Sequence, residues 1–168
     1  MNITFKYYFF FIVVLLQGCS YLDDINTKRL FHHFVNEHLN ENFDSFQNIN
    51  ISIREHDREG NVALVTNNNT KGWIYWIWIN DKTDLIKKTK ISLSRNLASL
   101  DTAKMKILAH KFMKYNMVYL SVDSTHNAYF TTIDRSILIQ VNNEKFVPSN
   151  YKKGWHHIKG KWFENMDY

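Results

Sequence analysis

Seven apolar residues, Trp-Ile-Tyr-Trp-Ile-Trp-Ile, follow one another from Trp73 to Ile79. Polar turn residues bound this run at 67–72 and at 80–84, so it predicts a β-strand. A strand of an antiparallel sheet with one face in water alternates apolar and polar residues. Because this strand is apolar on both faces, either both faces are covered or one of them serves as a binding surface.

Strand signals on both sides of this run extend the sheet. Before it, Ile49, Ile51 and Ile53 alternate with polar neighbours, which is typical of a half-buried strand. The other predicted strands are Val62–Thr66, about 89–94, Met117–Val122, Ala128–Ile133 and Ile137–Val141. The tail, Tyr151–Tyr168, is either a final strand or a wrapped extension. The sequence therefore predicts a mainly antiparallel sheet of about six to seven strands.

Two amphipathic segments predict helices. In the first, about Asp24–Asn42, one arc carries Leu30, Phe31, Phe34 and Val35 together with His38. The second begins at Asp101, a good N-cap, and runs to about Tyr115, with one apolar face made of Met105, Leu108, Ala109 and Phe112.

The order of these elements favours one α+β domain with both helices on one face of the sheet. A helix followed by antiparallel strands occurs twice, from about residue 24 and again from about residue 101. We find no matching residues between the two halves, so a single domain is favoured over a repeat. No Pro/Gly/Ser-rich linker divides this part of the chain.

The beginning of the chain has the character of a secretory signal. An apolar run from Tyr7 to Leu16 follows Lys6 and ends in Leu16-Gln17-Gly18-Cys19. The run is too short to span a bilayer, which takes about 20 apolar residues. Cys19 is the only cysteine, so it has no partner for a disulfide within the chain.

The junction Leu16-Gln17-Gly18-Cys19 resembles the lipobox of bacterial lipoproteins. The resemblance implies that Cys19 is diacylglyceryl-modified and becomes the first residue after cleavage. Residues 1–18 are then the signal peptide, 19–27 a lipidated tether and 28–168 the single α+β domain. Serine rather than aspartate at position 20 implies, by similarity to the enterobacterial sorting pattern, an outer-membrane location facing the periplasm. More than one acyl chain makes such anchoring stable, since each buried CH₂ contributes about 0.8 kcal/mol.

Charge and composition exclude few functions. The chain has 21 Lys and Arg against 16 Asp and Glu; the leader holds only Lys6, which leaves 20 against 16, or +4. This excess is too small to indicate a nucleic-acid partner.

The tryptophan-rich run is the candidate binding face, and its residues are Trp73, Tyr75, Trp76 and Trp78. Trp73 and Tyr75 lie on one face of the predicted strand, and Trp76 and Trp78 on the other. Such a cluster suits a protein-binding hot spot or a platform for stacking a sugar. The alternative is core packing, which we favour for the face toward the helices; for the opposite face both interpretations stay open.

No motif predicts a catalytic, metal or cofactor site. His33 and Glu37 are four residues apart, but His38 falls on the apolar face, and the His-Glu-x-x-His spacing is absent. We expect His32 and His33 to be solvated and His38 to be buried and hydrogen-bonded. The adjacent pair His156-His157 would point to opposite faces of a strand.

We therefore expect a non-enzymatic lipoprotein that binds a protein or another envelope component, such as an assembly factor, a pilotin or an immunity protein. Its expected partners are the membrane, through the lipid, and a periplasmic protein; the sequence does not fix the oligomeric state. The alternative is an envelope hydrolase whose site gathers two or more of His126, Asp123, His156 and Glu164. A purely structural surface protein is a third possibility.

Overall fold

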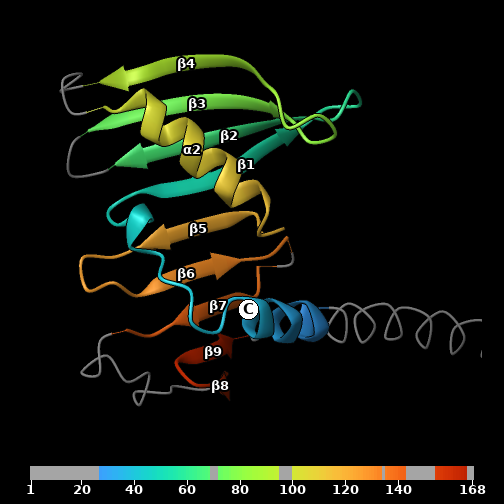
Figure 1. The fold of residues 1–168 in the computed structure, drawn as a ribbon, viewed down its shortest axis with the longest axis vertical. Helices are drawn as coiled ribbons and strands as arrows, with labels where there is room; N and C mark the ends of the chain where they lie inside the picture. Colours follow the sequence, from blue (N-terminus) through green and yellow to red (C-terminus); the bar gives the residue numbers. More distant parts are fainter. Residues whose placement is uncertain (1–26, 69–71, 95–99, 134, 143–153, 166–168) are drawn as a thin grey trace, which may run out of the picture.

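The described part of the chain folds into one antiparallel sheet with two α-helices packed on the same face (Figure 1). This is seen in a computed structural model that describes residues 27–68, 72–94, 100–133, 135–142 and 154–165. The fold class α+β is confirmed. The lipobox residues Leu16, Gln17, Gly18 and Cys19 lie outside the described residues, as does the beginning of the predicted first helix, 24–26.

The first half of the chain forms a helix and a four-stranded meander. Residues 27–37 are helical, and the elements that follow are η1 (Asp44–Phe46), β1 (Asn50–His56), β2 (Asn61–Asn68), β3 (Trp73–Asn80) and β4 (Ile86–Ser94). The second half comprises α2 (Thr102–Met113), β5 (Tyr119–Val122), β6 (Ala128–Thr131), β7 (Ile137–Gln140), β8 (Trp155–Lys159) and β9 (Trp162–Asn165).

Within the described residues, the sheet has nine strands in the order β4-β3-β2-β1-β5-β6-β7-β9-β8. The predicted count of six to seven strands is therefore wrong. The difference arises in the tail, which forms the hairpin β8–β9 instead of one strand or a wrapped extension. Gly160 turns this hairpin with φ +56°, a conformation that glycine adopts without steric cost.

Both helices use the faces that their sequences predict. Phe31, Phe34 and Val35 are buried, whereas His32 and His33 are exposed. The first helix ends at residue 37, earlier than the predicted Asn42, and a turn follows it.

The second helix begins as its sequence predicts. The Asp101 side chain accepts a hydrogen bond from the backbone N–H of Lys104 at 2.9 Å, as an N-cap should. All four residues of its predicted apolar face, Met105, Leu108, Ala109 and Phe112, are buried.

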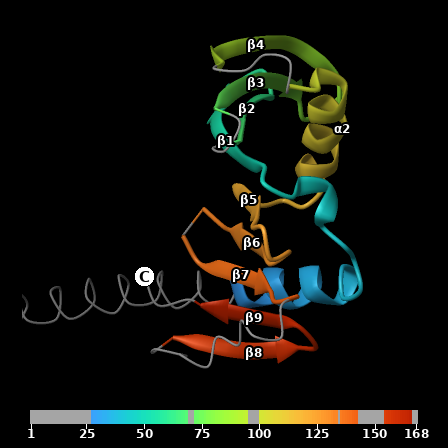
Figure 2. The same cartoon turned by 90° about the vertical axis from the view of Figure 1, so that its left-hand side faces the viewer.

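Each helix covers strands of the opposite half of the chain. The Phe34 ring lies 4.9 Å from the Phe130 ring on β6 and 5.7 Å from the Trp162 ring on β9. Conversely, α2 lies across β1–β4, as both views of the ribbon show (Figures 1 and 2). One hydrophobic core joins both helices to the sheet.

The β1–β2 and β5–β6 turns repeat the same hydrogen-bond pattern. The Asp57 carboxylate accepts hydrogen bonds from the backbone N–H of Asn61 at 2.8 Å and from its side-chain amide at 2.9 Å. The Asp123 carboxylate accepts the same two bonds from Asn127, at 3.0 and 3.2 Å. The two turns are therefore built by one motif, Asp-x-x-x-Asn.

An approximate two-fold relation between the halves follows. β1 pairs antiparallel with β5, and the order β4-β3-β2-β1 on one side corresponds to β9-β7-β6-β5 on the other. The residue before the asparagine of each turn has positive φ, +81° at Gly60 and +65° at His126. The next turns match as well, since Gly72 between β2 and β3 and Arg135 between β6 and β7 have φ +66° and +71°. A repeat, which was not favoured on the sequence alone, is therefore present in the topology of the sheet.

Candidate functional site

The tryptophan-rich run contributes to both faces of the sheet. Trp73 and Tyr75 are each 3% exposed and lie in the core on the face covered by the helices. Their inclusion in a candidate binding face is therefore wrong, because α2 covers that side of the strand (Figure 1). Trp76 and Trp78 lie on the opposite face and remain partly exposed.

Trp76 and Trp78 form a stacked pair on this open face. Their ring centroids are 5.6 Å apart and their planes differ by 18°. The Trp76 indole N–H donates to the Ser92 hydroxyl at 3.1 Å, and the Lys88 ammonium lies 5.1 Å from the Trp78 ring centroid. Cation–π contact and the hydrogen bond fix the two rings in place.

The strand register continues the open face beyond the tryptophans. Trp76 is opposite Lys90 on β4 and Val65 on β2. Val65 is opposite Ser52 on β1, which is opposite Tyr119 on β5. Since residues directly opposite in neighbouring strands share a face, this row places Lys90 and Val65 beside Trp76 and extends the open face to the hydroxyl groups of Ser52 and Tyr119.

A second candidate site is a cavity of about 800 Å³ at the end of the sheet where β5 turns into β6. We call it the His126 cavity. The segment after the first helix, the β5–β6 turn, the end of β7 and the β8–β9 turn all contribute to its wall. Its lining includes four side-chain amides and two lysines, which are Asn40, Asn42, Gln140, Asn142, Lys159 and Lys161.

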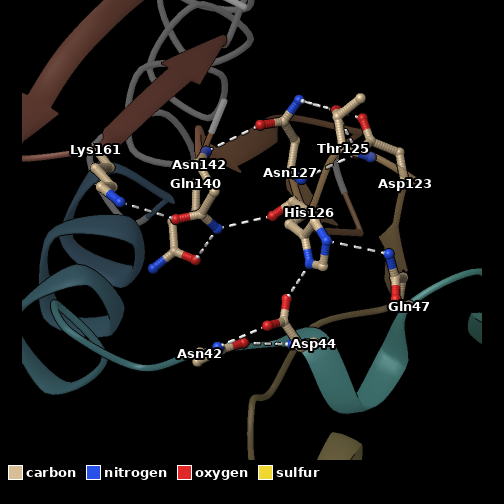
Figure 3. A network of polar contacts seen from close by, with 10 residues as sticks. All are labelled: Asn42, Asp44, Gln47, Asp123, Thr125, His126, Asn127, Gln140, Asn142 and Lys161. Carbon is tan, nitrogen blue, oxygen red and sulfur yellow. Dashed lines mark hydrogen bonds and ion pairs between the residues drawn. The ribbon is translucent and has the colours of Figure 1, made fainter. Parts of the chain in front are cut away.

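His126 is held in this cavity by one segment that is distant in sequence, residues 44–47 (Figure 3). Its Nδ1 lies 2.6 Å from the Asp44 carboxylate, and its Nε2 lies 3.3 Å from the side-chain amide nitrogen of Gln47. The hydrogen bond from His126, together with one from the Asn42 amide, lowers the pKa of Asp44. Asp44 therefore stays ionised and keeps the imidazole oriented.

The amides of the cavity are connected to one another (Figure 3). Lys161 Nζ donates to Asn142 Oδ1 at 3.3 Å, and Asn142 Nδ2 donates to Gln140 Oε1 at 3.0 Å and to the backbone carbonyl of His126 at 2.7 Å. Gln140 Nε2 donates in turn to the backbone carbonyl of Glu41 at 2.9 Å. Such a connected network holds its side chains in defined positions.

Glu41 joins this wall of the cavity to α2. Its carboxylate accepts hydrogen bonds from Tyr115 Oη and Lys111 Nζ, both at 2.8 Å, and contacts His38 Nδ1 at 2.5 Å. Burial raises the pKa of Glu41, but the hydrogen bonds from Lys111, Tyr115 and His38 outweigh it, so the pKa lies below its ordinary value. The expectation of a buried, hydrogen-bonded His38 is confirmed in part, because its side chain is 21% exposed.

The four residues proposed for a hydrolase do not share this cavity. His126 lines it, whereas Asp123, His156 and Glu164 do not. Asp123 holds the β5–β6 turn: burial raises its pKa, and hydrogen bonds from Thr125, Asn127 and others lower it below the ordinary value. His156 and Glu164 are opposite each other in the β8–β9 hairpin.

The other candidate histidines are not brought together in one site either. His33 pairs with Glu37 at 3.2 Å on an exposed helix face. The His157 ring lies 4.9 Å from the Phe163 ring, on the other face of the hairpin from His156. Within the described ranges, no three His, Cys, Asp or Glu residues are grouped as a metal site would require.

The contact between Asp44 and His126 was not predicted from the sequence, because 82 positions separate the two residues. One local signal was present. The match between Asp57-x-x-x-Asn61 and Asp123-x-x-x-Asn127 points to two equivalent turns, and it sets His126 apart as a residue that stands where the other turn has glycine.

Comparisons with protein families, curated proteins and solved structures bring no match to this chain. Among the helices of the described part, none has the length and apolar character needed to cross a membrane.

Proposed function

We propose that the protein is a lipid-anchored lipoprotein of the bacterial outer membrane that binds a periplasmic protein through its open sheet face. The resemblance of Leu16-Gln17-Gly18-Cys19 to a lipobox supports the anchor at Cys19. No enzymatic activity is needed for this role. Assembly factors, pilotins and immunity proteins are the classes of lipoprotein that act in this way.

The stacked pair Trp76 and Trp78 carries the proposal. Two large aromatic side chains that remain partly exposed on a rigid sheet are the residues that dominate binding at protein interfaces. Their positions are fixed before binding, so little side-chain entropy is lost when a partner covers them. Lys88 and Lys90 flank the pair on β4, which favours a partner whose contacting surface is acidic.

A pull-down from the native envelope tests this face. The full chain should capture a partner that Trp76→Ala and Trp78→Ala lose, while thermal unfolding shows that both variants remain folded. Ile107→Ala is the matched control, since Ile107 is 67% exposed on α2, on the other side of the sheet. Equal capture by the folded tryptophan variants would reject the face as the docking surface.

Fatty-acid labelling tests the anchor separately. Radiolabelled palmitate should enter the wild-type protein and not the Cys19→Ser variant. Equal labelling of the two proteins would contradict lipidation at Cys19, whatever the result of the pull-down.

An immunity role makes a narrower prediction. Cells that export the lipoprotein should survive one delivered toxin, and cells with the protein retained inside should not. Growth arrest despite correct export would exclude this role and leave assembly factor and pilotin.

An envelope hydrolase is the second candidate, and the His126–Asp44 contact favours it. A histidine oriented by a carboxylate can act as a general base toward water. Thr125 is not free to serve as a nucleophile, because its hydroxyl donates to Asp123 at 2.7 Å. Release of soluble fragments from purified cell envelope by the wild-type protein, abolished in His126→Gln, would favour this alternative over pure binding.

A further inference from the structure

We propose that the His126 cavity binds a small polar molecule that carries a carboxylate, of the sugar-acid class. This site is separate from the open sheet face and goes beyond the docking function proposed above. Its volume of about 800 Å³ falls within the range of roughly 300–1,000 Å³ that small-molecule sites occupy.

The charges of the cavity favour an anion. Lys159 and Lys161 are both exposed in its lining. The acids of the same wall are already engaged, since Asp44 pairs with His126 at 2.6 Å and Glu41 pairs with Lys111 at 2.8 Å. An ammonium group has three donors, and Lys161 uses one of them on Asn142 at 3.3 Å, so it retains capacity for a carboxylate.

The amides of the cavity favour a ligand with hydroxyl or amide groups. Asn142 and Gln140 are fixed by each other, by Lys161 and by backbone carbonyls, so they are oriented before any ligand arrives. Side-chain amides offer donors and acceptors together, which complements hydroxyl groups that also do both. A carboxylate on a hydroxylated, amide-bearing sugar combines the two features.

The two-fold relation provides an internal comparison. The equivalent end of the first half carries a cavity of about 540 Å³ beside His56. Residues at and after the end of α2, Met113, Lys114 and Asn116, contribute to its lining, as residues after the first helix, Leu39, Asn40 and Asn42, do in the His126 cavity. The position of each cavity, beside the residues that end a helix, is therefore a property of the fold.

The chemistry of the two cavities differs. The cavity beside His56 is lined by five aliphatic or methionine side chains, whereas Leu39 alone is aliphatic in the described lining of the His126 cavity. His126 holds a positive φ where the first half has Gly60, a conformation that costs a residue with a side chain about 1 kcal/mol. Since the same turn forms without the imidazole, the polar lining is not required by the fold and is available for a ligand.

Calorimetric titration of the purified full chain tests the proposal with defined probes. The probe is N-acetylmuramic acid, whose choice rests on the proposed envelope location, and N-acetylglucosamine is its neutral counterpart. We expect saturable one-to-one binding of the acid and at least about tenfold weaker binding of the neutral sugar. D-alanyl-D-alanine and inorganic phosphate test whether a peptide carboxylate or any anion suffices.

The variant Lys159→Gln with Lys161→Gln should bind the acid at least about tenfold more weakly. Both lysines are exposed, so folding should be unaffected, and Lys106→Gln on the exposed side of α2 is the matched control for loss of charge. Absence of saturable binding of the acid, equal binding of the neutral sugar or of phosphate, or unchanged affinity in the double variant would each overturn the proposal. These outcomes are independent of palmitate labelling and of the tryptophan variants, so failure here is distinguishable from failure of the docking function.

Discussion

At the scale of single residues, Glu41 connects the two halves of the chain. It accepts bonds from Lys111 and Tyr115 of the second half, while its own segment follows the first helix. We predict that Glu41→Gln lowers the free energy of unfolding at pH 7 by about 1–3 kcal/mol, because it weakens bonds to partly buried partners. Chemical denaturation measures this loss.

The effect of Glu41 should depend on pH. Its pKa is lowered in the folded protein, so its contribution to stability is fully present above the ordinary value of 4.5 and is lost as pH falls below it. The difference between wild type and Glu41→Gln should therefore shrink in acid. Glu37→Gln is the control, since the exposed His33–Glu37 pair should contribute less than about 0.5 kcal/mol. A difference that stays constant far below the ordinary pKa would contradict the assignment.

His126 and Gly60 occupy equivalent positions with left-handed backbone conformation. Substitutions at the two positions should have different effects on stability. His126→Gly should change stability by less than about 1 kcal/mol, because relief of backbone strain balances loss of the exposed Asp44 contact. Gly60→Ala should destabilise by more than about 1 kcal/mol, since its Cβ would meet the Asp81 carboxylate and φ is +81°. Denaturant midpoints compare the two variants, and an unchanged midpoint for Gly60→Ala would contradict the predicted contact with Asp81 and the backbone strain at position 60.

At the scale of elements, α2 depends on both its cap and its buried face. Asp101→Ala removes the acceptor for the Lys104 N–H and should cost about 1 kcal/mol, whereas Asp101→Asn should retain most of the stability. Thermal unfolding followed by circular dichroism measures both variants. Equal melting temperatures for Asp101→Ala and wild type would show that the cap contributes nothing.

At the scale of the whole molecule, each helix packs on strands of the other half of the chain, so each half should need the other in order to fold. The helix at 27–37 packs on β6 and β9, and α2 packs on β1–β4, so neither half contains the helix that covers its own strands. We predict that fragments 1–98 and 99–168 do not fold separately and regain structure when they are co-expressed. Dispersed amide NMR signals from either fragment alone would contradict this dependence.

Much of the local structure was predictable because its signals are local. The apolar run Trp73–Ile79, the faces of both helices and the Asp101 cap follow from residue spacing, and the structure confirms them. The tail was not predictable in the same way, since β9 is stabilised by pairing with β7, from which residues 141–161 separate it in the sequence, and only Gly160 marks the turn of the β8–β9 hairpin.

The sequence by itself determined the antiparallel α+β class, the two amphipathic helices and the separation of Trp76 and Trp78 from Trp73 and Tyr75, because periodicity is a property of neighbouring residues. Only the tertiary structure decided which face α2 covers, which half each helix covers, and that Asp44 meets His126. Those outcomes depend on residues far apart in the sequence, such as Asp44 and His126 at 82 positions, whose approach is set by sheet pairing and burial of the common core.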